Sequence, residues 1–148
     1  MKYIFSFLFF LSLHFSFAQQ SDTLNWNTII NNGNWQTYTS IKKLDSRLLK
    51  QFPRWKEISR VNGRFNGTDL GGGPRKRLFF AANYKNYWIV SYEHGGIGYH
   101  THCFFIYMKE DGSISSFDSY KTFKSLEELK KFVETNTIPV NQGSMYDY

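Results

Sequence analysis

The sequence predicts an α+β fold in which an N-terminal and a C-terminal helix pack on a mainly antiparallel sheet of about five strands. Apolar residues recur at helical spacing over 41–52 and again over 126–133. Between these two segments, short runs rich in aromatic and β-branched residues alternate with Gly-, Asn- and Asp-bearing turns. The connections between these runs are too short for parallel crossovers, so neighbouring strands must run antiparallel.

The individual elements follow from local signals. The first helix is predicted over 41–52, with Ser40 as its cap and Pro53 at its end. Ser125 and Glu128 have the spacing of a capping box, which begins the second helix. The strands are predicted over 55–65, 77–84, 87–94, 99–109 and 113–119. The Glu-Asp-Gly run at 110–112 predicts a hairpin between the last two strands, and Ile138-Pro139 is expected to end the regular structure.

Residues 1–18 have the pattern of a cleavable secretory signal peptide. Lys2 supplies the positive charge, residues 3–17 form an apolar, Phe-rich stretch, and Ser16-Phe17-Ala18 places small residues where a signal peptidase reads them. The apolar run is shorter than the roughly 20 residues of a membrane-spanning helix. Gln19 follows the cleavage site in place of a cysteine. We therefore expect an exported protein, periplasmic or extracellular, with no membrane span and no lipid anchor.

The remaining chain has the size and composition of one small packed domain. It is rich in aromatic residues and has no internal repeat, and we expect a single α+β domain over 19–140 followed by a C-terminal tail over 141–148. Cys103 is the only cysteine, so an internal disulfide is excluded. Because Cys103 lies in an apolar run, it is expected to be a small buried side chain and not a reactive thiol.

Positive charge is concentrated in residues 40–77, which hold eleven Lys and Arg residues against three acidic ones. This asymmetry indicates an anionic partner: a glycan, a nucleic acid, a lipid head group or an acidic protein. Arg75, Lys76 and Arg77 follow the Gly-rich segment 66–74 and are the predicted anion-binding residues. The segment lacks a Gly-Lys-Ser/Thr motif and leads into a strand, so it is not a phosphate loop. The alternative is a solvated basic helix face.

Three histidines, His94, His100 and His102, lie close together around the turn between the predicted strands 87–94 and 99–109. His100 and His102 must share a face if their strand is regular. A loop with an even number of residues, such as 95–98, places Glu93 opposite His100, whereas an odd loop places His94 on their face. We favour the even loop, because it collects the apolar residues 88, 90, 92, 101, 103, 105 and 107 on one buried face.

Such a cluster could perform two kinds of chemistry. His100 and His102, with Glu93 or His94, could bind zinc or iron, for which imidazole and carboxylate are common ligands. Alternatively, Glu93 and His100 could act as a general acid/base pair. The competing interpretation is a polar strand end that faces water. No cofactor is required by the sequence, and a His-x-His pair alone is not a metalloenzyme signature.

These observations favour a secreted, small, basic binding module with an anionic partner over an enzyme. No motif supports nucleic acid as that partner. The first alternative is a small secreted hydrolase, phosphodiesterase- or nuclease-like, that uses Glu93 and His100. The second is a metal-binding protein that uses His100 and His102.

Overall fold

The computed structural model describes residues 25–141, so the predicted signal peptide and most of the predicted tail lie outside the described residues. The elements in chain order are α1 (Trp26–Asn32), β1 (Gln36–Tyr38), the 3-10 helix η1 (Ile41–Lys43), α2 (Ser46–Gln51), the 3-10 helix η2 (Pro53–Glu57), β2 (Ile58–Ser59), β3 (Lys76–Tyr84), β4 (Tyr87–His94), β5 (His100–Met108), β6 (Ile114–Ser119), α3 (Leu126–Val133) and β7 (Val140–Asn141).

The strands form one sheet in the order β1-β3-β4-β5-β6-β7, with every neighbouring pair antiparallel. The short β2 pairs in parallel with the beginning of β3, on the same edge as β1. The predicted α+β class with a mainly antiparallel sheet is therefore confirmed. The long central strands β3 to β6 lie within a residue or two of their predicted positions. None of the helices in the described part of the chain is long and apolar enough to cross a membrane.

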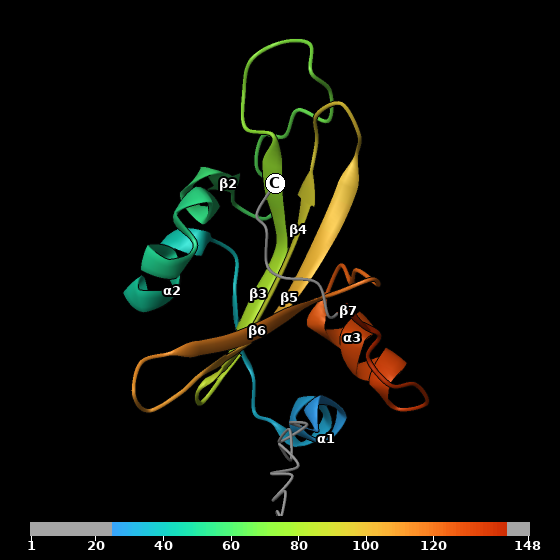
Figure 1. Cartoon of the computed structure of the whole chain (residues 1–148). Helices are drawn as coiled ribbons and strands as arrows, with labels where there is room; N and C mark the ends of the chain where they lie inside the picture. Colours follow the sequence, from blue (N-terminus) through green and yellow to red (C-terminus); the bar gives the residue numbers. More distant parts are fainter. Residues whose placement is uncertain (1–24, 142–148) are drawn as a thin grey trace, which may run out of the picture.

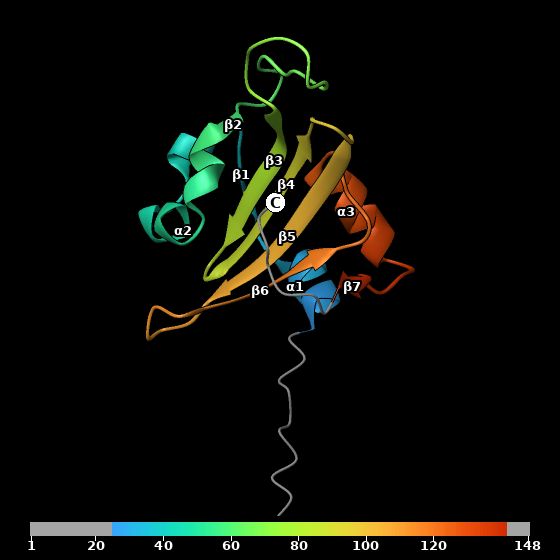
Figure 2. The same ribbon diagram turned by 45° about the horizontal axis from the view of Figure 1, so that its top comes forward.

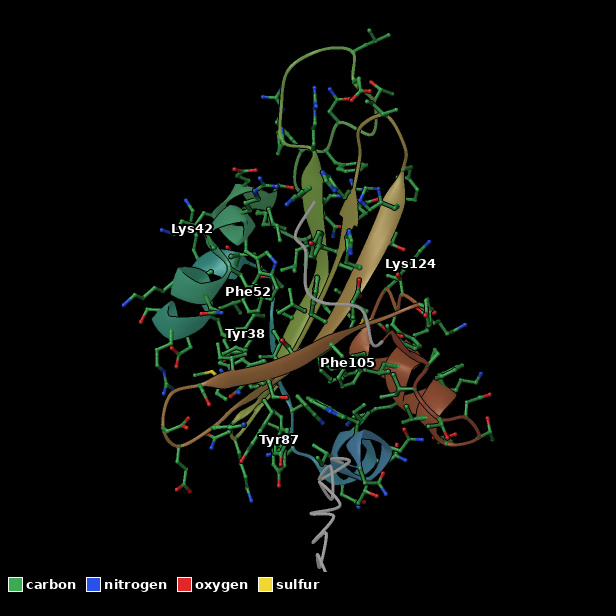
Figure 3. The ribbon with its side chains drawn as sticks, in the orientation of Figure 1. Tyr38, Lys42, Phe52, Tyr87, Phe105 and Lys124 are labelled. Atoms are coloured by element: carbon green, nitrogen blue, oxygen red, sulfur yellow. The ribbon has the colours of Figure 1, made fainter. Side chains whose placement is uncertain are left out.

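Helices cover both faces of the sheet (Figures 1 and 2). The α2 face is the side covered by η1, α2 and η2, and the α3 face is the side covered by α1 and α3. Figure 3 shows Phe52 beside α2 and Phe105 toward α1 and α3, on opposite sides of the sheet. Each face has its own buried cluster: Leu48, Phe52, Trp55, Val90 and Phe104 on the α2 face, and Trp26, Ile30, Ile89, Phe105 and Leu129 on the α3 face.

The predicted helix over 41–52 is interrupted, and the predicted strand over 55–65 is wrong. Leu44 has an extended backbone between η1 and α2, and the Asp45 carboxylate accepts the Arg47 backbone N–H at 2.8 Å, which begins a new helix. The chain then continues as η2, and only Ile58 and Ser59 pair with β3. Trp55 and Ile58 are three residues apart and both are buried, which is helical spacing and not the alternation of a strand.

An irregularity in β3 changes the direction of its side chains. Leu78 is paired with Tyr92 and Phe80 with Ser91, so Phe79 is an extra residue between two partners that are consecutive on β4. This is a β-bulge. On its far side, Ala81 is the partner of Val90 and faces α2.

The C-terminal part of the fold confirms the hairpin and the second helix. Gly112 has φ 82° in the turn between β5 and β6, a conformation that glycine adopts without strain. Ser125 Oγ accepts the Glu128 backbone N–H at 3.1 Å, and Glu128 accepts the N–H of Lys124, one residue before the cap. The predicted end of regular structure at Ile138-Pro139 is wrong, because β7 pairs with Asp118 and Ser119 of β6.

Cys103 is fully buried on the α3 face, as expected. Burial raises the pKa of its thiol far above the ordinary value, and the nearby Asp118 carboxylate adds to the shift. Ser91, its partner on β4, donates its hydroxyl proton to the Phe123 carbonyl at 2.6 Å. The thiol is therefore part of the core and inaccessible to a partner molecule.

Candidate metal centre

The hairpin between β4 and β5 brings the three histidines together at one end of the sheet. His94 is the register partner of His100, and Tyr92 is the partner of His102. The loop between the strands thus has five residues, 95–99, and places His94, His100 and His102 on the α2 face. The favoured even loop is wrong, and the odd loop, the alternative in the sequence analysis, is the one observed.

The incorrect register has a physical cause. Alternation assigns a register when one face of a hairpin is apolar and the other is polar. Here helices cover both faces, so Phe104 and Phe105, which point in opposite directions, are both buried. The apolar residues fit either register equally well, and only the polar strand ends distinguish the two.

The three imidazoles form a compact group. His94 Nδ1 lies 2.9 Å from His100 Nε2. The rings of His100 and His102 lie 4.9 Å apart at their centroids. One ring nitrogen from each histidine can be chosen so that all three lie within 4.8 Å of one another. His94 and His102 are partly buried and His100 is exposed, so the group lies at the edge of the core and is open on one side.

Two of the rings are oriented by acceptors behind them. His100 Nδ1 lies 2.9 Å from the Gly98 carbonyl oxygen, and His102 Nδ1 lies 3.1 Å from Asp118 Oδ2. Since a carbonyl or a carboxylate can only accept, both Nδ1 atoms donate a proton, and each neutral ring keeps its lone pair on Nε2. An acceptor that fixes the tautomer of a histidine is the usual companion of a metal-ligating imidazole.

Asp118 is the residue that sequence reasoning missed. It lies on β6 opposite Phe104, which is two residues from His102 on the same face of β5. While Oδ2 of Asp118 contacts His102, its Oδ1 accepts the Cys103 backbone N–H at 3.0 Å. The hairpin at 110–112 was predicted correctly, and extending its pairing would have brought Asp118 to the same face as His102. The His102 ring is further held by stacking on Phe104, with centroids 5.8 Å apart.

The arrangement fits a tetrahedral ion with three histidine ligands. Zn–N bonds of about 2.0–2.1 Å at tetrahedral angles place ligand nitrogens about 3.3 Å apart. The 2.9 Å separation of His94 Nδ1 and His100 Nε2 is slightly shorter than that value, and the three nitrogens together lie within 4.8 Å of one another, so the His102 ring would have to move toward the other two wherever its separation exceeds about 3.3 Å. His94 would have to give up the proton on Nδ1 in order to ligate an ion. With His94, His100 and His102 as its ligands, a zinc ion would be of the kind that keeps a further position for water in catalytic sites.

Glu93 does not belong to this group. It lies on the α3 face, beside Arg77 on β3 and Thr101 on β5. Its buried carboxylate accepts from Arg77 Nε at 2.5 Å and from the Tyr99 hydroxyl at 3.0 Å. Tyr99 is exposed over most of its side chain, but partial desolvation, and after it the hydrogen bond to Glu93, raises its pKa. The predicted pairing of Glu93 with His100 is therefore not formed, because the two side chains point to opposite faces of the sheet.

The three predicted anion-binding residues do not share one face of the sheet. Arg75 is exposed and lies 3.6 Å from Asp69. Lys76 is buried on the α2 face, directly opposite His94, with its ammonium 5.9 Å from the centre of the Tyr92 ring. Arg77 points to the α3 face, where it pairs with Glu93 and lies over the Phe65 ring at 4.9 Å. Arg75 and Lys76 line the same hollow beside His94, whereas Arg77 lies on the other face.

The loop before β3 packs directly against the histidine hairpin (Figures 1 and 2). Gly95 donates its backbone N–H to the Arg75 carbonyl at 2.7 Å. A side chain at Gly95 would meet the Asn66 carbonyl oxygen at 2.4 Å and the Gly67 Cα at 2.7 Å. The residues that precede β3 are therefore held next to the histidines.

Comparison with known proteins yields no relative: no family model, no curated protein and no solved structure matches this chain significantly.

Proposed function

We propose that this chain is a metal-binding protein whose centre consists of His94, His100 and His102. The observation that carries the proposal is the convergence of three imidazole nitrogens within 4.8 Å, in which two rings have their Nδ1 atoms engaged by the Gly98 carbonyl and by Asp118. A chance group of surface histidines would not be expected to have its tautomers fixed in this way. Zinc is an ion that three neutral imidazoles commonly bind in proteins.

The geometry of the site bears on the hydrolase interpretation and leaves the other sequence-based predictions as they were. A hydrolase based on a Glu93–His100 pair is not supported, since these side chains face away from each other. The anionic partner remains a prediction, and so do export through residues 1–18 and a periplasmic or extracellular location. A metal centre is compatible with each of these predictions, because its three ligands all lie within the segment expected to remain after signal cleavage.

The test is a zinc titration of the untagged, metal-free protein by calorimetry. We expect one zinc per chain in the wild type and loss of this binding in each of His94→Ala, His100→Ala and His102→Ala. Cobalt in place of zinc should give the intense visible absorption of a tetrahedral site. A wild type that binds no metal, or that binds it equally after any of these substitutions, would overturn the proposal.

Two matched variants separate the possible ligand sets. Thr101→Val changes the residue between His100 and His102 but points to the α3 face, and it should leave zinc binding intact. Glu93→Gln should also leave the stoichiometry at one zinc per chain. If Glu93→Gln abolishes binding while His94→Ala does not, the ligand set with Glu93 is the correct one and the observed register is wrong in solution.

A further inference from the structure

Exposed apolar side chains gather on two loops at one end of the sheet. Leu70, in the loop that precedes β3, is 85% exposed, and Ile97, in the loop between β4 and β5, is 100% exposed. Tyr99, in the second loop, is 58% exposed. Among the described residues, Tyr120 is the one other large apolar side chain that is exposed. Single exposed apolar residues are ordinary on a protein surface, whereas a group of them marks an interaction site.

The two loops are packed against each other, so their exposed side chains belong to one feature. Both loops lie at the same end of the sheet (Figures 1 and 2). A Cβ at Gly96, the residue before Ile97, would lie 3.6 Å from Asp69 Oδ1. Asp69 in turn directly precedes Leu70. We call Leu70, Ile97 and Tyr99 the apolar tip.

The exposure of Leu70 is fixed by an ordered loop. Asn66 Nδ2 donates to the Leu70 carbonyl at 3.0 Å and to the Gly71 carbonyl at 3.2 Å, and Thr68 Oγ1 lies 3.1 Å from the Leu70 carbonyl oxygen. Gly71 has φ 94°, a conformation that glycine adopts without strain. The loop thus satisfies its own backbone and holds an apolar side chain in water. Such a side chain gains free energy when an apolar phase receives it.

Positive charge surrounds the apolar tip. Residues 60–77 and 93–100 hold five Lys and Arg residues against two carboxylates, so this end of the molecule is positive whichever ion pairs form. Arg75 and Arg77 are engaged in the ion pairs described above, and the exposed Arg64 adds charge at the foot of the loop before β3. Anionic head groups attract such cations when they come close to a membrane surface.

The aromatic and cationic groups lie nearer the sheet than the aliphatic side chains. The Asn66 backbone N–H donates to the Pro74 carbonyl at 2.9 Å and closes the loop that carries Leu70, and Arg64 precedes this closure. Tyr99 directly precedes β5, whereas Ile97 lies two residues farther into its loop. Aliphatic side chains foremost, with an aromatic ring and cations behind them, is the order typical of segments that enter a membrane surface.

We infer that the apolar tip inserts into the surface of an anionic lipid bilayer, with Leu70 and Ile97 among the acyl chains and Arg64 among the head groups. A lipid surface fits better than a protein partner, because side chains that project from loops need a groove on a protein and none in a bilayer. This inference does not rest on the proposed metal centre. It narrows the anionic partner predicted from the sequence to a lipid surface.

The first experiment measures cosedimentation with vesicles of phosphatidylglycerol and phosphatidylcholine in equal amounts. The chain begins at Gln19, because the apolar residues 1–18 would themselves bind lipid, and EDTA keeps metal ions from bridging histidine and lipid. Leu70→Asn and Ile97→Asn should each weaken binding about tenfold, since each removes an aliphatic side chain from an apolar phase. Tyr120→Asn is the matched control outside both loops and should bind as the wild type does. All these chains should unfold at the same urea concentration, because the substituted side chains are exposed in the folded state.

The charge contribution is tested separately. Vesicles of phosphatidylcholine alone should bind the wild type at least about tenfold more weakly than the mixed vesicles. Arg64→Gln should weaken binding to the mixed vesicles about fivefold. Lys109→Gln is the matched control, since Lys109 is exposed at the opposite end of β5. Equal losses in the two variants would show that net charge, and not the tip, attracts the lipid.

A fluorescent label tests insertion directly. Because Cys103 is buried, a cysteine introduced by Ile97→Cys can be labelled selectively with a nitrobenzoxadiazole dye. Its emission should shift to shorter wavelength when mixed vesicles are added, whereas the same dye on Tyr120→Cys should show no shift. Absence of vesicle binding, an equal loss in Tyr120→Asn, or no shift at position 97 would overturn the inference. So would a wild-type dimer that Leu70→Asn and Ile97→Asn dissociate, because a second copy of the chain would then cover the tip. Each of these failures leaves the metal centre standing, and a failed zinc titration leaves the lipid contact standing.

Discussion

The two faces of the sheet carry different polar groups at the same end of β4 and β5. On the α3 face, Glu93 is enclosed by Arg77 and Tyr99, and its charge is matched by a partner of opposite charge. On the α2 face, His94, His100 and His102 converge beside Lys76, with two of their rings held by acceptors. Alternating residues of the β4–β5 hairpin thus contribute to an ion pair with Arg77 of β3 on one face and to a group of three converging histidines on the other. Three predictions can break or sharpen this distinction.

The largest effect is expected from Asp118→Asn. Replacing an acceptor behind a metal-ligating histidine typically lowers metal affinity by about 10- to 100-fold. Asparagine keeps an oxygen for the Cys103 backbone N–H, but its amide can turn an N–H toward His102 Nδ1. This would favour the tautomer whose Nε2 carries the proton and cannot bind the ion. Calorimetric zinc titration measures the change. Unchanged zinc affinity would remove Asp118 from the metal centre.

The second prediction concerns the closed pair. Glu93→Ala should lower the free energy of unfolding by about 2 kcal/mol, because Arg77 and Tyr99 lose a charged acceptor that is buried in the folded state. Arg77 is partly exposed and can regain water, which keeps the loss below that of a fully buried pair. Urea unfolding measures it, and the cycle with Arg77→Ala isolates the pair. Zinc affinity should stay within about threefold, and a loss as large as that of His94→Ala would contradict the separation of the faces.

The smallest effect is expected at Asp45, which caps α2, takes part in neither polar group and therefore serves as a reference for both. Asp45→Ala should cost about 1 kcal/mol, because the carboxylate caps α2. The hydrogen bond from the Arg47 side chain lowers the pKa of Asp45, so this stabilisation is present above the ordinary pKa of an aspartate and is lost as the pH falls through the lowered value. Urea unfolding at neutral and acidic pH tests it. The difference between variant and wild type should shrink at acidic pH, and a constant difference would contradict it.

Local signals sufficed for the fold class and for the long strands. The alternation of residues along β3 to β6, with turn residues at short intervals, placed these strands correctly. The same alternation placed His100 and His102 on one face, as observed. Local patterns could not decide between His94 and Glu93, since this choice depends on the length of a loop between two strands that are buried on both sides. The strand prediction over 55–65 also relied on Trp55. Aromatic residues occur both in strands and in 3-10 turns, so their presence did not distinguish the two.

Asp118 required the pairing of β6 with β5 to be extended from the 110–112 turn. Its place beside His102 follows from the β5–β6 register alone, over a distance of several residues from the turn that sets this register. The separation of Lys76 from Arg77 had a different cause. Adjacent residues on a strand face opposite ways, so Lys76 and Arg77 point to different faces of the sheet, whereas residues 75–77 were expected to bind an anion together.

The extra residue in β3, Phe79, reverses the faces to which the preceding residues of the strand point. If Phe79 were absorbed into a regular ladder that continued from Ala81 and Val90, Arg77 would be the partner of His94, and Lys76 would point to the α3 face. Glu93 would then lose the Arg77 guanidinium that neutralises it. The histidines would have the planar guanidinium of Arg77 beside them in place of the flexible Lys76 ammonium. One unpaired residue near the middle of the strand therefore selects which cation serves each face.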